Sequence, residues 1–222
     1  MGLLYRCSVM FFYIWLHALH GFKIYGRKNR PRRKPFIVVS NHVSLADPPA
    51  VGITFQRFVL SFMAKKELFE SRRWGWWFKG TNCIPISRNK NDFSATKEAL
   101  RRLAKGEAIV IFPEGTRSDN NEMKDPELGV AFLASKANVP VCPIYIDGTY
   151  GVLPKGGKYK AWEQVRVFIG PSLDVSSVDP KLERRKRYEV IADKIMKAIA
   201  ELKKQSEAAG PLKSSRARLM KS

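Results

Sequence analysis

Two residues early in the chain could form an acid–base pair: His42, and Asp47 five positions after it. A loop of this length can fold back so that the carboxylate accepts a hydrogen bond from one imidazole nitrogen, which leaves the other nitrogen free to accept a proton. Asp47 is followed by Pro48, so this aspartate also makes a good N-cap for a helix that begins with proline. Taken alone, the pair fits both a general base and a capping aspartate beside an incidental histidine.

A second cluster, in the segment FPEGTRS, has residue types that bind phosphate. Gly115 lets the backbone approach a ligand closely, and Arg117 presents a planar set of donors that matches phosphate oxygens. Thr116 and Ser118 add hydroxyl groups. Glu114 cannot contact phosphate favourably, so we interpret it as a strut for an arginine or as a partner of a substrate hydroxyl. A salt-bridged turn is the plain alternative.

Two further clusters are less distinctive by themselves. Residues 82–88 form a short strand pattern that ends in Arg88, and residues 139–144 form an apolar strand pattern. Alone, they fit a surface arginine and an edge strand. All four clusters nevertheless adjoin predicted strands, and ligands bind at the carboxyl ends of parallel strands. Their common placement favours a single site.

The elements that must position these clusters alternate between strand and helix along the chain. Short, β-branched apolar runs predict buried strands at residues 36–39, 58–62, 83–86, 108–112, 140–146 and 165–169. The spacing of apolar residues predicts helices at residues 93–103, 128–135 and 188–202. Such alternation implies parallel crossovers, so we expect an α/β fold with a mostly parallel central sheet flanked by helices.

The composition restricts the partners of this fold. Of the 222 residues, 40 are lysine or arginine and 20 are aspartate or glutamate, which gives a formal net charge of +20. Such an excess predicts a polyanionic partner, namely nucleic acid, an anionic membrane or an anionic substrate. No recognition-helix motif or zinc finger supports nucleic acid. Cys7, Cys83 and Cys142 are far apart and form no CxxC pair, which argues against a disulfide framework or a metal site and fits a reducing compartment.

The first residues differ from the rest of the chain. Residues 7–22 carry no formal charge, but their apolar run is shorter than the roughly 20 residues of a spanning helix, and no cleavage site follows it. Seven cations come next, without an acid among them: Lys23, Arg27, Lys28, Arg30, Arg32, Arg33 and Lys34. We therefore expect a helix in the membrane interface, with a basic flank that could hold the mouth of the site against an anionic surface. The charge run also fits a generic solvated face. A core helix packed on the domain is the alternative.

These patterns divide the chain into three parts. Residues 1–22 form the expected N-terminal membrane-associated helix, and residues 23–204 form the α/β domain. Residues 205–222 form a basic tail that we expect to be flexible. If the N-terminal segment spans the membrane, its basic flank puts the domain on the cytoplasmic side.

The four clusters in this order resemble a known family. NH-x4-D (Asn41, His42, Asp47), a strand ending in Arg88, FPEGTRS and VPVxP are similar to the motifs of the PlsC group of glycerolipid acyltransferases. The best-known members are 1-acylglycerol-3-phosphate O-acyltransferases, also called lysophosphatidic acid acyltransferases. One departure is Asn82, at a position where the family's second motif often has glycine. It puts the backbone of that loop in doubt, but not the role of Arg88.

The resemblance implies a mechanism and a set of site residues. His42, oriented by Asp47, would take the proton from the sn-2 hydroxyl of 1-acylglycerol 3-phosphate. That hydroxyl would attack the thioester of acyl-coenzyme A or an acyl carrier protein, giving phosphatidic acid. Arg88 and Arg117 would hold the acceptor phosphate, helped by the Gly115 backbone. Glu114 would organise that pocket, and Thr116 is a further substrate-binding residue of the motif.

The resemblance also implies what the site lacks and where it works. The sequence has no GxSxG elbow and no plausible cysteine nucleophile, so direct transfer without an acyl-enzyme fits better. No metal or resident cofactor is expected. The acyl chain should occupy a hollow that involves residues 139–144 or the aromatic run 74–78, although that run also fits a face in contact with the membrane. The expected partners are the lysophospholipid, the acyl thioester and an anionic membrane surface at the cytoplasmic face, and not nucleic acid.

Other functions remain open at this stage. Within the same chemistry, the acceptor could be another lysolipid or glycerol 3-phosphate itself. From another class, the basic charge fits a nucleic-acid-binding or lipid-binding protein without catalysis. The intact pair of His42 and Asp47 argues against a silent relative.

Overall fold

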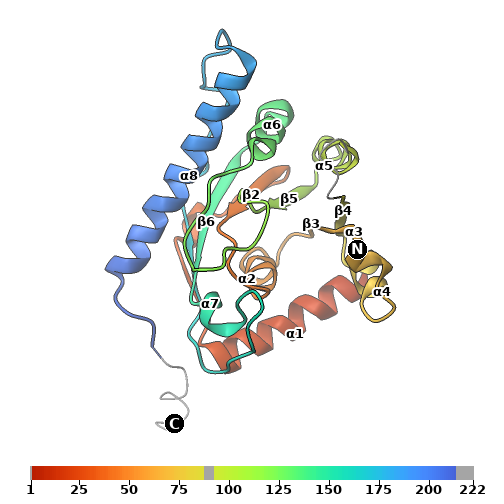
Figure 1. Cartoon of the computed structure of the whole chain (residues 1–222), viewed down its shortest axis with the longest axis vertical. Helices are drawn as coiled ribbons and strands as arrows, with labels where there is room; N and C mark the ends of the chain where they lie inside the picture. Colours follow the sequence, from red (N-terminus) through yellow and green to blue (C-terminus); the bar gives the residue numbers. More distant parts are fainter. Residues whose placement is uncertain (1, 88–92, 214–222) are drawn as a thin grey trace.

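A seven-stranded sheet forms the centre of the molecule (Figure 1), in the order β1-β7-β6-β2-β5-β3-β4. The computed structural model describes residues 2–87 and 93–213, so Arg88 lies outside the described residues. The strands are β1 (Lys23–Tyr25), β2 (Phe36–Ser40), β3 (Leu60–Lys65), β4 (Ile84–Ile86), β5 (Ala108–Ile111), β6 (Val141–Asp147) and β7 (Arg166–Ile169). Strands β2 to β6 are mutually parallel, whereas β7 is antiparallel to β6 and β1 is parallel to β7. The prediction of a mostly parallel sheet is confirmed.

Helices cover both faces of this sheet. The long helices are α1 (Leu3–His20), α5 (Ser94–Ala104), α6 (Leu128–Ala137) and α8 (Arg184–Ala208). The shorter ones are α2 (Asp47–Thr54), α3 (Lys66–Glu70), α4 (Gly75–Gly80), α7 (Thr149–Val152) and the 3-10 helix η1 (Arg27–Asn29). In Figure 1, α8 and α6 lie on one side of the strands, and α1 crosses below α2.

Alternation along the central strands produces two separate cores. On β2, Ile37 and Val39 pack with α5, α6 and α8. Their neighbours Phe36 and Val38 face the other way and pack with α1 and α2. All four are fully buried, because successive side chains of a strand point to opposite faces and this strand is covered on both. The continuous apolar run in the sequence reflects this double burial.

Two strands differ from the expectation. The strand expected at 58–62 begins at Leu60, because a turn in which Phe58 N–H donates to the Phe55 carbonyl (2.8 Å) occupies the residues before it. Strand β1 was not predicted, since three half-exposed residues show no usable alternation. Its register pairs Lys23 with Arg166 and Tyr25 with Phe168.

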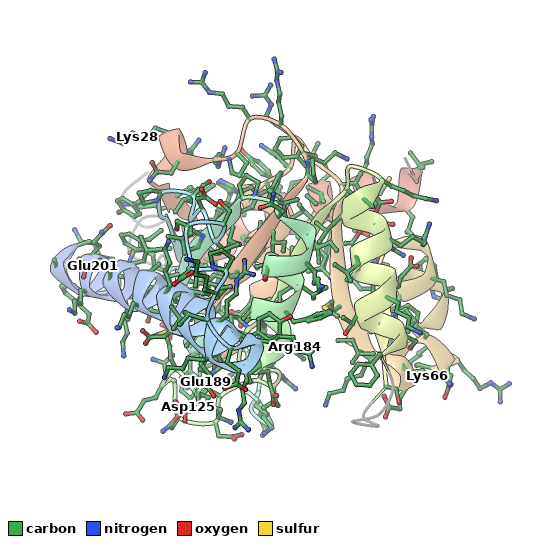
Figure 2. All side chains as sticks on the ribbon, turned by 90° about the horizontal axis from the view of Figure 1, so that it is seen from above. Lys28, Lys66, Asp125, Arg184, Glu189 and Glu201 are labelled. Carbon is green, nitrogen blue, oxygen red and sulfur yellow. The ribbon has the colours of Figure 1, made fainter. Side chains whose placement is uncertain are left out.

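Strand β1 also changes the position of the basic flank. Residues 27–34 lead to the start of β2, whereas His42 follows the end of β2. The flank therefore runs away from the edge of the sheet where His42 lies. Figure 2 shows Lys28 of this flank and Lys66, at the end of β3, on opposite sides of the molecule. The expectation that the basic flank borders the mouth of the site is therefore wrong for residues 27–34.

Helix α1 has one face against the domain and one face exposed. Tyr5, Leu16 and His20 are buried, while Phe11 and Ile14 are 63% and 60% exposed. Within residues 2–87 and 93–213, no helix has the length and apolarity needed to cross a membrane. Helix α1 therefore packs on the domain, as a core helix would, and also exposes an apolar face, as a helix in the membrane interface would.

The last helix continues past residue 204, where we expected the domain to end. Ser206 is buried, and its hydroxyl donates to Asp147 (2.7 Å). Asp147 also pairs with the buried Arg166 (2.6 Å), which donates to the Gly210 carbonyl (2.8 Å). The end of α8 is therefore fastened to β6 and β7 by a buried ion pair that adjacent residues of the sequence do not reveal.

Candidate active site

The end of β2 is held in place by a side chain. The amide of Asn41 donates to the Ile146 carbonyl (2.9 Å) and accepts from the Ile146 N–H (2.8 Å). It therefore continues the pairing of β2 with β6 after the regular strand has ended. Asn41 is buried, and the next residue, His42, turns into a cavity at the carboxyl edge of the sheet.

The imidazole of His42 is oriented by Asp47, which their spacing allows and the family resemblance implies. Nδ1 lies 2.8 Å from Asp47 Oδ2, and the same oxygen accepts the backbone N–H groups of Val43 (2.8 Å) and Ser44 (2.7 Å). A carboxylate only accepts, so Nδ1 carries the hydrogen and Nε2 is the free base. The expected N-cap is not formed: Asp47 is the first residue of α2, its N-cap is Ala46, and the carboxylate points back over the loop.

The carboxylate of Asp47 is buried, and hydrogen bonds reach only one of its two oxygens within the described residues. It is fully buried, and its second oxygen, Oδ1, forms no hydrogen bond with the part of the chain that the structure describes. A buried carboxylate of this kind is stabilised when a positive charge develops beside it. Proton uptake at Nε2 during a reaction would create that charge on His42, so Asp47 is placed to stabilise the transient charge as well as to fix the tautomer.

The segment FPEGTRS forms hydrogen bonds with both backbone groups of His42. Glu114 Oε1 accepts the His42 N–H (3.0 Å), and the Ser118 N–H donates to the His42 carbonyl (2.8 Å). The ring of Phe112 stacks on the imidazole, with centroids 4.0 Å apart. The first and second motif clusters therefore form one rigid unit around the histidine.

Glu114 has a different place from the one expected. It is buried, and its second oxygen accepts the Lys124 N–H (3.2 Å), so both oxygens hold backbone and neither holds an arginine of the described residues. Burial raises the pKa of Glu114, and the two backbone N–H donors partly offset this rise. Glu114 acts as a strut between the histidine loop and residue 124.

The other residues of this segment lie at the rim of the cavity. Gly115, Thr116 and Arg117 all line it. Gly115 has a φ of 66°, and a Cβ there would also press on Glu127 (3.1 Å), so the position favours glycine. Within the described residues the Arg117 guanidinium forms no ion pair. Arg117 is thus available to an anionic ligand close to His42.

The cavity is large and mostly apolar. It has a volume of about 920 Å3 and extends from His42 to side chains of α1, α2, β3 and α4. Of the aromatic run 74–78, Trp77 and Phe78 line it, while Trp74 and Trp76 are 58% and 60% exposed. The indole N–H of Trp77 donates to Ser8 (2.9 Å), which joins α4 to α1 across the cavity.

Residues 139–144 do not line this cavity, contrary to one of the two alternatives for the hollow. Val141, Cys142 and Ile144 are fully buried, because β6 lies between β2 and β7 in the sheet. Their apolar character serves the core. The sequence could not separate a core strand from a hollow wall, since both select the same residue types.

Cysteines are poorly placed for covalent catalysis. Cys83 lines the cavity, but burial raises its pKa. Burial raises the pKa of Cys142 to about 12. A thiol with a raised pKa is a weak nucleophile near neutral pH. Across residues 2–87 and 93–213, no three His, Cys, Asp or Glu side chains are grouped so as to hold a metal.

Two cations of the cavity lining were not singled out from the sequence. Lys65 is the last residue of β3, and Lys155 follows α7. The signal for Lys65 was available, because it ends a parallel strand at the same edge as His42. Lys155 had no such signal, because it follows a short helix and a turn. Arg88, which was expected to contribute here, is outside the described residues and stays a prediction.

Known proteins with similar sequences were identified by three comparisons. The family model described as Acyltransferase matches residues 21–147. A 1-acyl-sn-glycerol-3-phosphate acyltransferase from Pseudomonas aeruginosa is 31% identical over 209 residues, which cover 89% of this chain and 71% of that protein. One from Bacillus subtilis is 29% identical over 138 residues, 62% of this chain and 66% of that protein.

A solved structure has the same fold. The crystal structure of the 1-acyl-sn-glycerophosphate acyltransferase PlsC from Thermotoga maritima superposes with a TM-score of 0.68 at 26% identity. The superposition covers 89% of this chain and 78% of that chain. Matches to the first curated relatives, from Bacillus subtilis and Streptococcus pneumoniae, span 66% and 62% of those proteins.

Proposed function

The chain belongs to the acyltransferase family and is an enzyme of that class, and we propose that its acceptor is 1-acylglycerol 3-phosphate. In this reaction a fatty acyl group moves from an acyl thioester to the sn-2 hydroxyl, and phosphatidic acid is formed. One observation carries the proposal: the free base of His42 and the unpaired guanidinium of Arg117 line the same, mostly apolar cavity. A phosphorylated amphiphile needs a cation for its phosphate and an apolar surface for its acyl chain.

The proton moves through His42. Nε2 takes the proton of the sn-2 hydroxyl, and the oxygen attacks the thioester carbonyl. A C–O bond forms and the C–S bond breaks, after which the departing thiolate receives the proton from the imidazolium. Asp47 keeps Nδ1–H in place throughout and stabilises the transient positive charge. No enzyme-bound acyl group is required, which agrees with the raised pKa of Cys83.

The phosphate of the acceptor is held by Arg117, with the backbone at Gly115 close to the ligand. Arg88 is a second arginine for this role in our proposal. The apolar side of the cavity, which includes the side chains of Phe62 and Trp77, accepts acyl chains. Acyl-coenzyme A and acyl carrier protein both remain candidate donors, because both present the same thioester.

We also propose that the enzyme works at the surface of a membrane. Val9 and Phe12 of α1 line the cavity, while Phe11 and Ile14 of the same helix are exposed. Helix α1 therefore stands between the cavity and the outside. If its exposed face lies in the interface, a lysolipid can enter the cavity without crossing water. The cytoplasmic side is expected, since acyl thioesters of both kinds are intracellular carriers.

Product analysis tests this function. The purified chain is incubated with a mixed pool of lysolipids and glycerol 3-phosphate, and with palmitoyl-coenzyme A or palmitoyl acyl carrier protein. Mass spectrometry should detect phosphatidic acid that carries the palmitoyl group as the dominant product. Another acylated acceptor would replace the proposed substrate, and the absence of any transfer with both donors would contradict the proposal.

A further inference from the structure

A second loop contacts the histidine loop directly. The Ser44 hydroxyl donates to the Leu153 carbonyl (2.8 Å), and the Leu45 N–H donates to the same oxygen (3.3 Å). Ser44 and Pro154 pair as an isolated β-bridge. These contacts fix the backbone that leads into Lys155 beside the residues that follow His42.

The side chain of Lys155 then reaches the arginine loop. Its Nζ lies 2.8 Å from Asp119 Oδ1, and Asp119 follows Arg117 by two positions. The Tyr150 hydroxyl donates to the Asp119 carbonyl (2.9 Å), which ties α7 to the same loop. Lys155, Arg117 and His42 all line the cavity. Lys155 therefore joins the two motif loops, with its backbone beside the histidine loop and its ammonium on the arginine loop.

The charges around this rim leave a positive surplus. Lys65, Arg117 and Lys155 line the cavity, and Glu127 is the acid among its lining residues. Asp119 has a second cationic partner, because Lys124 Nζ lies 3.3 Å from its other oxygen, Oδ2. If the ammonium of Lys155 turns to a ligand, Asp119 keeps Lys124.

The ion pair of Lys155 with Asp119 can also be replaced by a contact of Lys155 with phosphate at little cost in stability. The side chains are 42% and 62% exposed, and ion pairs this exposed contribute little to stability. A phosphate presents more charge and more acceptor oxygens than one carboxylate shared by two lysines. Lys155 can therefore move to a phosphate at the cavity mouth without a large loss.

From these contacts we propose that Lys155 is a further substrate-binding residue, whose ammonium binds a substrate phosphate together with Arg117. The inference rests on the proposed function, which brings a phosphate to this rim. Two sources have the required chemistry: the phosphate of the lysolipid acceptor and the phosphate groups of coenzyme A. Asp119 positions the ammonium until the phosphate arrives.

Steady-state kinetics of Lys155→Met test the proposal. Apparent KM is measured for lysophosphatidic acid at saturating palmitoyl-coenzyme A, and then for palmitoyl-coenzyme A at saturating acceptor. Losing a charge-assisted contact should raise one KM about ten-fold with little change in kcat. A rise for the lysolipid assigns the acceptor phosphate, and a rise for the thioester assigns coenzyme A. Lys155→Arg should restore most of the affinity.

Two further variants test whether the change in KM comes from a phosphate contact of Lys155, from the loss of any positive charge, or from a disturbed loop. Lys158→Met removes an exposed charge of the same loop that does not line the cavity, and it should leave both KM values unchanged. Asp119→Asn removes the competing carboxylate and should lower the KM that Lys155→Met raises. If the ion pair were only structural, both of its variants would raise KM alike, and that result would overturn the proposal.

The failure of this inference is distinguishable from failure of the proposed function. Wild-type protein that transfers no acyl group contradicts the proposed function. Wild-type protein that transfers it, while Lys155→Met keeps both KM values, contradicts only the role of Lys155. Calorimetric titration with lysophosphatidic acid and with coenzyme A measures binding without turnover, and unchanged dissociation constants for both in Lys155→Met would overturn the inference as well.

Discussion

At the scale of single residues, the site depends on how completely His42 is held. Its ring is fixed by Asp47 and Phe112, and its backbone by Glu114 and Ser118. Of the imidazole atoms, Nε2 is left to face the cavity as a base. A catalytic group held this way loses little orientational freedom when the substrate binds, which lowers the barrier of proton transfer.

Replacing His42 by asparagine should remove catalysis and keep the fold. The asparagine amide can still donate to Asp47, so the buried carboxylate retains a partner, but no base faces the substrate. We expect kcat to fall about 10²- to 10⁴-fold, measured as transfer of radiolabelled palmitoyl groups. His17→Asn, at a half-buried histidine outside the cavity lining, is the matched control and should keep full activity. Wild-type kcat in His42→Asn would eliminate this residue as the base.

Glu114 offers a graded test of its structural role. In Glu114→Gln the amide oxygen can accept one of the two N–H groups, whereas in Glu114→Leu both the His42 and Lys124 N–H groups lose their partner. Each buried unsatisfied group costs about 1–3 kcal/mol. The free energy of unfolding in urea should therefore fall from wild type to glutamine to leucine, and kcat should follow.

The control for this series is Glu122→Gln, an exposed glutamate of the same loop. It should have wild-type stability and kcat. A leucine variant that is as stable as wild type but has a higher KM for the acceptor would instead support contact between Glu114 and substrate.

At the scale of elements, α1 is fastened to the domain at its carboxyl end by a chain of hydrogen bonds. The Trp15 indole N–H donates to the Tyr159 hydroxyl (3.2 Å), and this hydroxyl lies 3.1 Å from His20 Nε2. His20 Nδ1 lies 2.9 Å from the Glu163 carbonyl. A carbonyl only accepts, so His20 is the Nδ1–H tautomer and Nε2 accepts from Tyr159. The chain is complete only when His20 is neutral.

The attachment of α1 should therefore weaken in acid. Desolvation by burial lowers the pKa of His20 below its usual 6.5, although the backbone carbonyl and the charge of Glu163 act in the opposite direction. The unfolded chain then binds more protons than the folded chain as the pH falls below about 6.5. Stability is fully present above that value and is lost as the pH falls towards the lowered pKa of the folded state.

Urea denaturation at pH 7.5 and pH 5.5 measures this effect. The wild-type free energy of unfolding should be lower at pH 5.5, and His20→Asn, which does not titrate, should show a smaller decrease. His17→Asn removes a half-buried histidine of the same helix that is not part of this hydrogen-bond chain, and it should leave the wild-type decrease unchanged. An equal decrease in His20→Asn and wild type would show that other groups cause the acid sensitivity.

At the scale of the whole molecule, the cavity is enclosed by elements from both ends of the sheet order. Helix α1 comes from the start of the chain and α4 precedes the edge strand β4, yet Ser8 and Trp77 meet in the wall of the cavity. The exposed apolar residues of α1 lie on the outside of this enclosure. Membrane contact and substrate entry are thus combined in one helix in our proposal.

Vesicle flotation tests this arrangement. In Phe11→Ser/Ile14→Ser, two exposed apolar side chains that would enter the interface are lost, at about 1.5–3 kcal/mol each when fully buried. The fraction of protein that floats with anionic vesicles should fall at least ten-fold. Phe93→Ser removes a side chain that is 64% exposed at the start of α5 and should float like wild type. Equal flotation of the double variant and wild type would place the membrane contact elsewhere.

The local sequence determined the elements and the motif chemistry of this protein. Apolar runs such as residues 36–39 and 108–112 predict buried strands, because double burial of a parallel strand selects the same residue types at every position. The spacing of His42 and Asp47 allows their hydrogen bond, because five residues permit a single tight loop, but it fits a capping aspartate equally, and the family resemblance decided between the two. These inferences succeed because burial and short loops act over a few residues.

Contacts between distant segments decided the rest. The reversed direction of β1 moves the basic flank away from the site, the position of β6 puts residues 139–144 in the core, and the β-bridge between Ser44 and Pro154 brings Lys155 to the rim. Glu114 became a strut because the N–H groups of His42 and Lys124 lie within its reach only after folding. Each of these outcomes depends on hydrogen bonds between segments that fold together from different parts of the chain. The local sequence around each residue does not predict such hydrogen bonds.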